Sequence, residues 1–239
     1  MRETGSNISP DKKILSIRLT SSGLSFYVST ARSARGEERY FSFAGRDAGP
    51  GMAVRNIIDS TPELSGYFTS VNVFIDTADT VYAPSEVLRT DNAAAFLNGL
   101  GLYIPPEGGV AVSPAVGDVR AAMRYDARAL SFLSDYYGAK LSFYSPLQEN
   151  LELAGRAGNP EGFIANITER NIYIVRFDKE KRLLLSEVYP YYTDADIVFY
   201  LHKLGEDSGL RNPKIRIFGP GSGAAYKILR KYFRGVLCV

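Results

Sequence analysis

The sequence has very few residues of the kinds that hold metals, form disulfides or move protons. Among 239 residues there is one cysteine, Cys238, and one histidine, His202. A single cysteine excludes a disulfide within the chain and nearly excludes a metal site built on cysteine. A histidine-dependent mechanism would have to use His202, and no Gly-x-Ser-x-Gly nucleophile elbow is present. We interpret Cys238 as a small apolar residue and His202 as a surface or boundary residue.

The chain also lacks a strong net charge and a long apolar run. It has 28 Lys and Arg against 26 Asp and Glu, a formal net charge of +2. Domains that bind nucleic acid usually carry a clustered basic face, so no nucleic-acid partner is expected. No run approaches the ~20 apolar residues that a membrane helix needs. The polar N-terminus carries no signal segment, and we expect a cytoplasmic location.

The composition is that of a folded globular protein. Hydrophobic residues make up 45% and charged residues 23%, which argues against disorder. The polar residues 1–12 are the exception and are expected to be a disordered tail. Gly155–Pro160 is the clearest linker. We therefore predict two lobes, 13–158 and 159–239.

The first lobe is predicted to open with a three-stranded meander, followed by a helix, a strand and a second helix. The segments expected to form these elements, in that order, are 13–20, 24–28, 39–43, 52–60, 71–76 and 84–100. Residues 103–117 are rich in proline and glycine and are expected to form a loop. Asp126 can cap a further helix that Gly138 ends. A strand at 141–144 and a helix at 148–154 are expected to complete the lobe.

The second lobe is predicted to repeat the same order. Its expected strands are 162–168, 172–177, 183–188, 215–218 and 235–239. One helix starts at Thr193, where Asp196 completes a variant of the capping box, and another follows the Gly219–Gly223 turn. The first hairpins of the two lobes superpose at an offset of 148 residues (163 − 15), with Leu15 on Phe163. The sequence thus predicts a duplicated β-β-β-α-β-α unit.

This doubled order resembles the actin-like superfamily, which includes actin, sugar kinases and the large heat-shock chaperones. The resemblance implies an α/β protein with two ribonuclease H-like lobes around a cleft. More narrowly, the chain is similar to a bacterial domain-of-unknown-function family, number 3822. The narrower similarity is carried by the segments 15–20, 23–26, 81–88, 191–196 and 218–219, and it extends over nearly the whole chain after the tail.

The resemblance also implies where catalytic residues should lie. Active members of the superfamily carry Asp-x-Gly at the first hairpin of each lobe, where the Asp holds Mg²⁺ and the Gly lets backbone N–H groups approach phosphate. At the Asp positions this chain has Arg18 and Asn166, and at the Gly positions it has Thr20 and Thr168. A cation about 4 Å from Mg²⁺ would cost roughly 4 kcal/mol per unit charge at an effective dielectric near 20. No catalytic residue, metal site or cofactor is therefore expected, and ATP with Mg²⁺ is not favoured.

The chain retains candidate residues for a weak nucleotide or anion site. Its candidate residues are Arg18, Ser21, Ser22, Asn166, Gly219, Gly221 and Ser222. The superfamily binds adenosine at a glycine-rich turn like Gly219–Gly223, and a helix N-terminus can receive an anion. Two alternatives stay open. The glycines either serve this purpose or only allow a tight turn and close packing, and Arg18 either points outward or binds an anion in the cleft.

Two further features of the sequence are candidates for chemistry or binding. Asp76 and Asp79, at the end of a predicted strand, form the best carboxylate pair, although turn residues of this kind often serve structure alone. The 16 tyrosines indicate amphipathic surface of the kind found in interfaces. We predict a non-catalytic binding or assembly module with a protein partner or a homo-oligomeric state. The alternative is an ATP-binding switch, or an ATPase or kinase-like enzyme, that uses the cleft and the Gly219–Gly223 turn.

Overall fold

The computed structural model describes residues 12–30, 36–44, 49–156, 161–180 and 182–239. The predicted tail falls almost wholly on residues 1–11, outside this part of the chain. The chain divides into two compact units. The first consists of Met1–Ile75, Arg89–Pro114 and Ala122–Tyr144, and the second of Asp76–Leu88, Ala115–Ala121 and Ser145–Val239. This division places segments from before residue 158 with the second half of the chain, unlike the contiguous lobes expected from the sequence.

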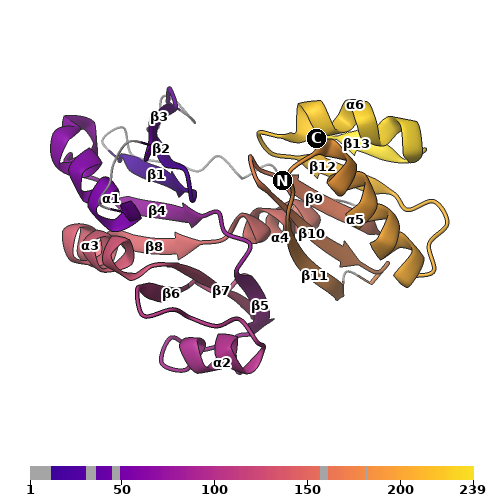
Figure 1. Ribbon diagram of the computed structural model, residues 1–239, viewed down its shortest axis with the longest axis horizontal. Helices are drawn as coiled ribbons and strands as arrows, with labels where there is room; N and C mark the ends of the chain where they lie inside the picture. The colour runs from indigo at the N-terminus through magenta and orange to yellow at the C-terminus, as the bar shows by residue number, and fades with distance from the viewer. Residues whose placement is uncertain (1–11, 31–35, 45–48, 157–160, 181) are drawn as a thin grey trace, which may run out of the picture. The chain divides into compact units, whose positions relative to one another are not determined.

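The first unit contains a five-stranded sheet with the strand order β3-β2-β1-β4-β8 (Figure 1). Its strands are β1 (Ile14–Leu19), β2 (Gly23–Ser29), β3 (Arg39–Ser42), β4 (Ser70–Ile75) and β8 (Leu141–Tyr144). β1 pairs antiparallel with β2 and parallel with β4. The meander predicted at the start of the chain is therefore present, and β1 lies in the middle of the sheet with Leu15, Ile17 and Leu19 buried.

Two helices of the first unit, α1 (Gly49–Ser60) and α3 (Ala127–Tyr137), pack against each other. The Asp126 carboxylate accepts a hydrogen bond from the Ala129 N–H at 2.9 Å. Gly138 follows the last residue of α3 with φ 58°, a conformation that glycine adopts without strain. Both predicted ends of α3 are confirmed. Short 3-10 turns occupy Pro62–Leu64 and Gly138–Lys140.

The predictions between β4 and α3 were wrong in two places. Residues 80–84 form the strand β5 (Thr80–Pro84), and the helix expected at 84–100 is reduced to α2 (Ala93–Gly99). The expected loop at 103–117 contains β6 (Gly108–Val112), which pairs antiparallel with β7 (Val119–Asp126) in a sheet of order β5-β7-β6. Gly109 explains the second error: a Cβ there would lie 3.0 Å from the Ala127 Cα. Here glycine lets a strand approach a helix.

The second unit is built on the strands β9 (Gly162–Ile167), β10 (Asn171–Phe177), β11 (Leu183–Pro190), β12 (Ile215–Phe218) and β13 (Val236–Cys238). β13, β12 and β9 run parallel, β10 and β11 run antiparallel, and β9 contacts β10 along its length. β9 begins 148 residues after β1 (162 − 14) and β10 begins 148 residues after β2 (171 − 23). These strand positions match the predicted offset.

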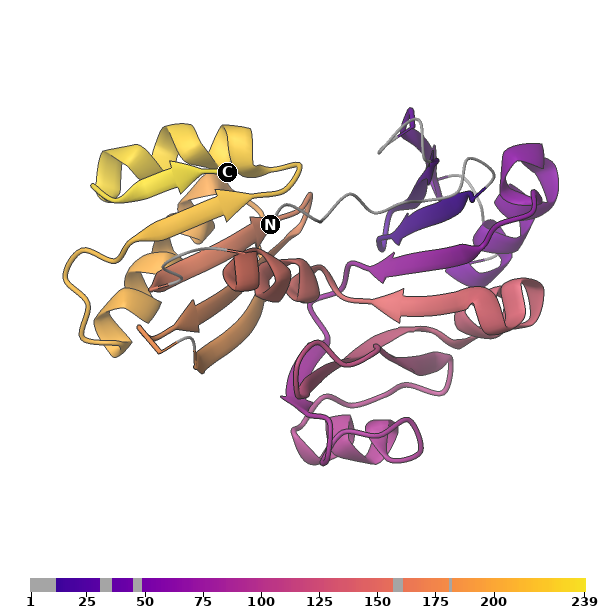
Figure 2. The same ribbon diagram turned by 180° about the vertical axis from the view of Figure 1, so that it is seen from behind.

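Helices cover both faces of the second unit's sheet. Successive residues of β9 and β10 alternate between two buried clusters, as side chains on a strand must. The cluster with Phe163 and Ile174 packs under α5 (Asp194–Asp207) and α6 (Ser222–Tyr232), and the cluster with Ile164 and Tyr173 packs under α4 (Pro146–Arg156). α5 lies before the sheet in Figure 1 and α4 in Figure 2.

The predicted start of α5 is confirmed. The Asp196 carboxylate accepts hydrogen bonds from the backbone N–H groups of Thr193, at 2.8 Å, and Tyr192, at 2.9 Å. These N–H groups lower the pKa of Asp196, since they stabilise its charged form. Among the described residues, no helix is long and apolar enough to cross a membrane.

Candidate functional site

The turns of the two first hairpins are closed in the same way by a threonine. In the first unit, the Thr20 hydroxyl accepts hydrogen bonds from the N–H groups of Gly23 (3.0 Å) and Ser22 (3.2 Å). In the second unit, the Thr168 hydroxyl accepts from the Asn171 N–H at 3.2 Å. In both turns the threonine's own N–H donates to the carbonyl three residues on, at 2.9 Å. The side chain at the expected glycine position thus engages backbone donors of its own turn.

In each turn, a tyrosine hydroxyl donates a hydrogen bond to the backbone carbonyl of the threonine. Tyr125 donates to the Thr20 oxygen at 2.8 Å, and Tyr191 donates to the Thr168 oxygen at 2.6 Å. Burial raises the pKa of both phenols, and nearby Asp126 and Asp194 raise them further. Both tyrosines therefore remain protonated donors at neutral pH. Each turn therefore contains the same set of hydrogen bonds, formed by a threonine hydroxyl, the turn backbone and a tyrosine hydroxyl.

Asp76 joins this network in the second unit. Its carboxylate is buried, and one oxygen accepts hydrogen bonds from the Asn171 amide (2.8 Å), the Tyr173 hydroxyl (2.8 Å) and the Thr168 hydroxyl (3.1 Å). The other member of the predicted pair, Asp79, donates a turn hydrogen bond from its backbone N–H to the Thr77 hydroxyl oxygen at 3.2 Å. Asp76 thus ties the segment Asp76–Leu88 to the β9–β10 hairpin, as a structural anchor.

Asn166 occupies the second expected metal-binding position and is fully buried. Its amide nitrogen donates to a Glu149 carboxylate oxygen at 2.6 Å and to the Pro146 carbonyl at 3.2 Å. Both partners are acceptors, so the site requires a donor. An aspartate there would face a carboxylate and a carbonyl with no proton to share.

We expect Asn166→Asp to lower the free energy of unfolding by about 2 kcal/mol at pH 7, because two buried acceptors lose their donor. Like charges would raise the pKa of the new carboxyl in the folded state. The folded protein would then bind more protons than the unfolded one, so the loss should shrink from pH 7 to pH 5. Urea unfolding at both pH values measures this. Asn166→Leu, which adds no charge, should be destabilised equally at both, and identical pH behaviour of the two variants would contradict the argument.

The glycines of the Gly219–Gly223 turn lie against the end of β9. Phe218 pairs with Asn166 in the β12–β9 ladder, and the turn passes directly over that strand. A Cβ at Gly219 would lie 2.3 Å from the Asn166 side-chain oxygen, and one at Gly221 would lie 2.6 Å from the Thr168 carbonyl oxygen. The Gly221 N–H also donates to the Ile167 carbonyl at 2.8 Å. These contacts favour the packing interpretation of the glycines.

The predicted site residues fall into two groups. Arg18, Ser21 and Ser22 belong to the first unit, where Arg18 is half-buried on β1 between Ser25 and Phe74 of the neighbouring strands. Asn166, Gly219, Gly221 and Ser222 belong to the second unit. There Asn166 and Gly219 lie side by side, and the Ser222 hydroxyl lies 3.7 Å from the Cys238 sulfur. In the described part of the chain, no three Asp, Glu, His or Cys residues are grouped as a metal site would require.

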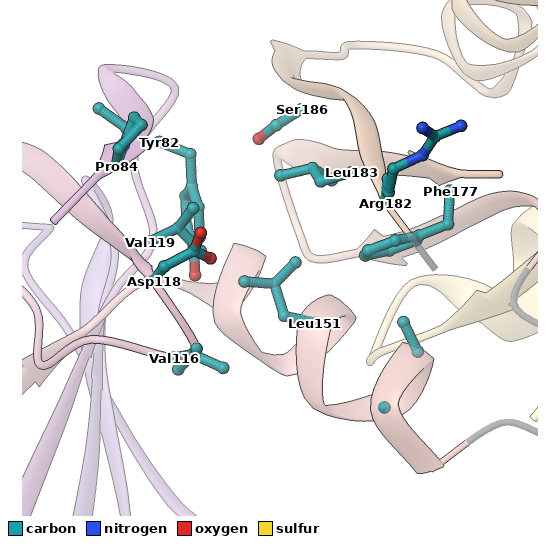
Figure 3. A pocket seen from close by; sticks show the side chains of 14 residues that line it. Tyr82, Pro84, Val116, Asp118, Val119, Leu151, Phe177, Arg182, Leu183 and Ser186 are labelled. Atoms are coloured by element: carbon teal, nitrogen blue, oxygen red, sulfur yellow. The ribbon is translucent and has the colours of Figure 1, made fainter. Parts of the chain in front are cut away.

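A separate cavity of about 690 Å³ lies within the second unit (Figure 3). Its labelled lining residues are Tyr82, Pro84, Val116, Asp118, Val119, Leu151, Phe177, Arg182, Leu183 and Ser186. Arg182 is already engaged by Asp178, 2.6 Å away. Burial, and then the negative charge of Glu152, raise the pKa of Tyr82, so its hydroxyl stays neutral. The walls are mainly apolar and the volume suits a small molecule.

Comparison with known protein families shows to which family the chain belongs. The family described as "Protein of unknown function (DUF3822)" matches residues 3–236. The chain belongs to the DUF3822 family. No curated protein matches its sequence. The family similarity expected from the sequence is therefore confirmed.

Two solved structures show the fold of this DUF3822 chain. One is a protein of Bacteroides thetaiotaomicron VPI-5482 with an actin-like ATPase fold and unknown function, at 19% identity and a TM-score of 0.76, covering 96% of this chain and 91% of that one. The other is the ethanolamine utilization protein EutJ from Carboxydothermus hydrogenoformans, at 10% identity and a TM-score of 0.50, covering 97% and 86%. The predicted actin-like α/β fold is confirmed.

Sequence reasoning missed the tyrosines that complete the site in this DUF3822 chain. Tyr125, Tyr173 and Tyr191 are three of 16 tyrosines, and no spacing distinguishes them from the others. Thr20 and Thr168 could be found, because the offset of 148 residues aligns them. The same offset aligns Gly23 with Asn171, and this pair is the other sequence signal that marks the two turns.

Proposed function

We propose that this protein is a non-catalytic binding or assembly module that keeps the actin-like fold around a degenerate nucleotide site. The observation that carries the proposal is the closure of both hairpin turns by Thr20 and Thr168. A phosphate at either turn would have to displace the threonine hydroxyl from the N–H groups that it engages. Each such exchange forfeits a hydrogen bond with a net worth of about 1 kcal/mol.

The metal side of the site supports the same conclusion. Arg18 replaces one expected acid with a cation, and Asn166 replaces the other with an amide whose donors are used by Glu149 and Pro146. Mg²⁺ prefers carboxylate oxygens and phosphate oxygens as ligands. Neither position offers it a carboxylate, so the charged ligands of the Mg²⁺ that activates phosphoryl transfer are missing at the expected places.

A binding role is supported by surfaces and cavities that lie apart from the degenerate site. The second unit holds the mainly apolar cavity beside Tyr82, and large aromatic side chains such as Tyr192 (82% exposed) reach the solvent. We propose a protein partner, or further copies of the chain, in the cytoplasm as the setting for this module. Because one fold can carry many different functions, the fold alone does not support a function for this chain. The support comes from the two closed turns, the cavity and the exposed aromatic side chains.

Isothermal titration calorimetry with Mg-ATP tests the proposal. We expect no saturable heat and no release of phosphate. The opposite result would be micromolar binding that is lost in Gly221→Ala but kept in Gly223→Ala, where a Cβ meets no atom within 4 Å. That pattern would establish the ATP-binding switch instead. Circular dichroism of both variants shows whether each is folded before its titration is interpreted.

A further inference from the structure

α5 and α6 lie side by side over one face of the second unit's sheet and leave a surface groove between them. The groove has a volume of about 420 Å³. Val198 and Phe199 of α5 and Ile228 and Tyr232 of α6 form its apolar walls. Both helices are visible in yellow and orange in Figure 1.

The groove exposes large aromatic side chains to water. Phe199 is 63% exposed and Tyr232 is 62% exposed. The core cluster under the helices contains Leu201 of α5 and Leu229 of α6, with Val198 and Ile228 packed against it, but not Phe199 or Tyr232. Contiguous exposed apolar surface of this kind typically marks a contact with another macromolecule.

The two helices carry opposite charges. α5 contains four acidic residues (Asp194, Asp196, Glu206 and Asp207) and one lysine (Lys203), a net charge of −3. α6 contains three basic residues (Lys227, Arg230 and Lys231) and no acid, a net charge of +3. Lys203 already pairs with Asp207 at 2.7 Å. Among the described residues, by contrast, no acid forms an ion pair with Lys227 or Lys231.

We propose that this groove is occupied by the same groove of a second copy of the chain. A two-fold axis that runs along the groove places α5 of each copy over α6 of the other. The acidic helix then meets the basic helix twice, and the aromatic stripe is buried at the centre. The net charges of α5 and α6 are opposite in sign, so in this arrangement each helix of one copy faces a helix of opposite net charge in the other. The choice of a second copy as the partner rests on the proposed assembly function.

An anionic membrane is a poorer match for the same surface. The basic residues of α6 would favour it, but the acidic α5 borders the same groove and would be repelled. A surface that carries both signs in adjacent stripes fits a partner with the same two stripes. The experiment nevertheless includes vesicles as a separate arm.

Light scattering coupled to size exclusion tests the dimer over a range of protein concentrations. We expect wild-type protein to move from monomer to dimer mass, and Phe199→Asp to raise the dissociation constant by about tenfold or more, as central aromatic contacts do. Tyr103→Asp changes an aromatic residue that is 70% exposed in the first unit and should leave the dimer intact. Added salt should weaken the dimer, because the flanking charges are screened.

A charge-exchange pair makes the test specific for the proposed geometry. One variant, Lys227→Glu with Lys231→Glu, makes both helices acidic. The other, Glu206→Lys with Asp207→Lys, makes both helices basic. Each variant alone should be monomeric, whereas a mixture of the two should restore dimers, because in the mixed dimer every acidic helix meets a basic one.

Three outcomes would overturn the inference. These are a wild-type monomer at the highest soluble concentration, charge variants that dimerise as well as wild type, or a mixture that stays monomeric. Sedimentation with vesicles of phosphatidylserine and phosphatidylcholine that is lost only in the α6 variant would assign the groove to a membrane instead. None of these results bears on Mg-ATP binding, so failure of the dimer and failure of the proposed non-catalytic role are distinguishable.

Discussion

Replacement of Asp76 by alanine is expected to lower the free energy of unfolding by about 2 to 3 kcal/mol, because it removes a buried acceptor that three donors share and leaves the Asn171 amide without it. Asn171, Tyr173 and Thr168 all direct a polar hydrogen at one oxygen of Asp76. With the carboxylate removed, the Asn171 amide loses this acceptor, whereas the Tyr173 and Thr168 hydroxyls keep the carbonyls of Thr77 (3.1 Å) and Asn171 (3.0 Å). Urea unfolding followed by circular dichroism measures the loss.

The matched control for this prediction is Glu169→Ala. Glu169 lies in the same β9–β10 turn, and its side chain is exposed. Its removal should change the stability by less than about 0.5 kcal/mol. Tyr173→Phe, which removes a single donor to Asp76, should fall between the two. If Asp76→Ala proved as mild as Glu169→Ala, Asp76 would not be the anchor of the hairpin, and a functional role for its carboxylate would become the better explanation.

Gly219→Ala is expected to cost about 3 kcal/mol or to prevent folding of the second unit. The residue has φ 95°, which costs a residue with a side chain about 1–2 kcal/mol. In addition, a Cβ would lie 2.3 Å from the Asn166 side-chain oxygen and 2.6 Å from the Ile167 carbonyl oxygen. Those neighbours belong to a strand of the sheet and have little freedom to move.

Gly223→Ala is the comparison within the same turn. A Cβ at Gly223 would meet no atom within 4 Å, and the residue lies in the first turn of α6. Alanine there should be neutral or stabilise the helix by up to about 1 kcal/mol. Thermal unfolding of both variants gives the difference. Equal stabilities would contradict the packing interpretation of the glycine-rich turn and would favour a ligand-binding purpose for Gly219.

The predictions from sequence succeeded where local patterns carried the information. The alternation in residues 13–20 marks β1 because one strand period places apolar side chains on one face. Asp126 and Thr193 mark helix starts because a cap is a local hydrogen bond. The predictions failed at β5, whose partner β7 lies more than 30 residues further on, and at β6, where glycines that suggest a loop let a strand approach a helix. Pro84 ends the edge strand β5 instead of opening a helix.

The division into units shows the same limit. The linker Gly155–Pro160 is a clear local signal, yet α4, which precedes it, packs on the second unit's sheet. Leu147 and Ala154 on one side of α4 meet Ile164 and Tyr173. The sequence of an amphipathic helix indicates that one face will be buried, but it does not indicate which of the two cores that face will pack against.

The sequence by itself determined the fold class, the paired hairpins and the absence of acids at the two expected metal positions. These depend on periodicity, on a fixed offset and on residue identity, and each can be read along the chain. Only the tertiary structure decided that Tyr125 and Tyr191 bind the two threonine turns and that Asp76 anchors the second hairpin. Those roles arise from hydrogen bonds between groups up to 105 residues apart. Such bonds depend on where the packed core places each side chain, which no local pattern encodes.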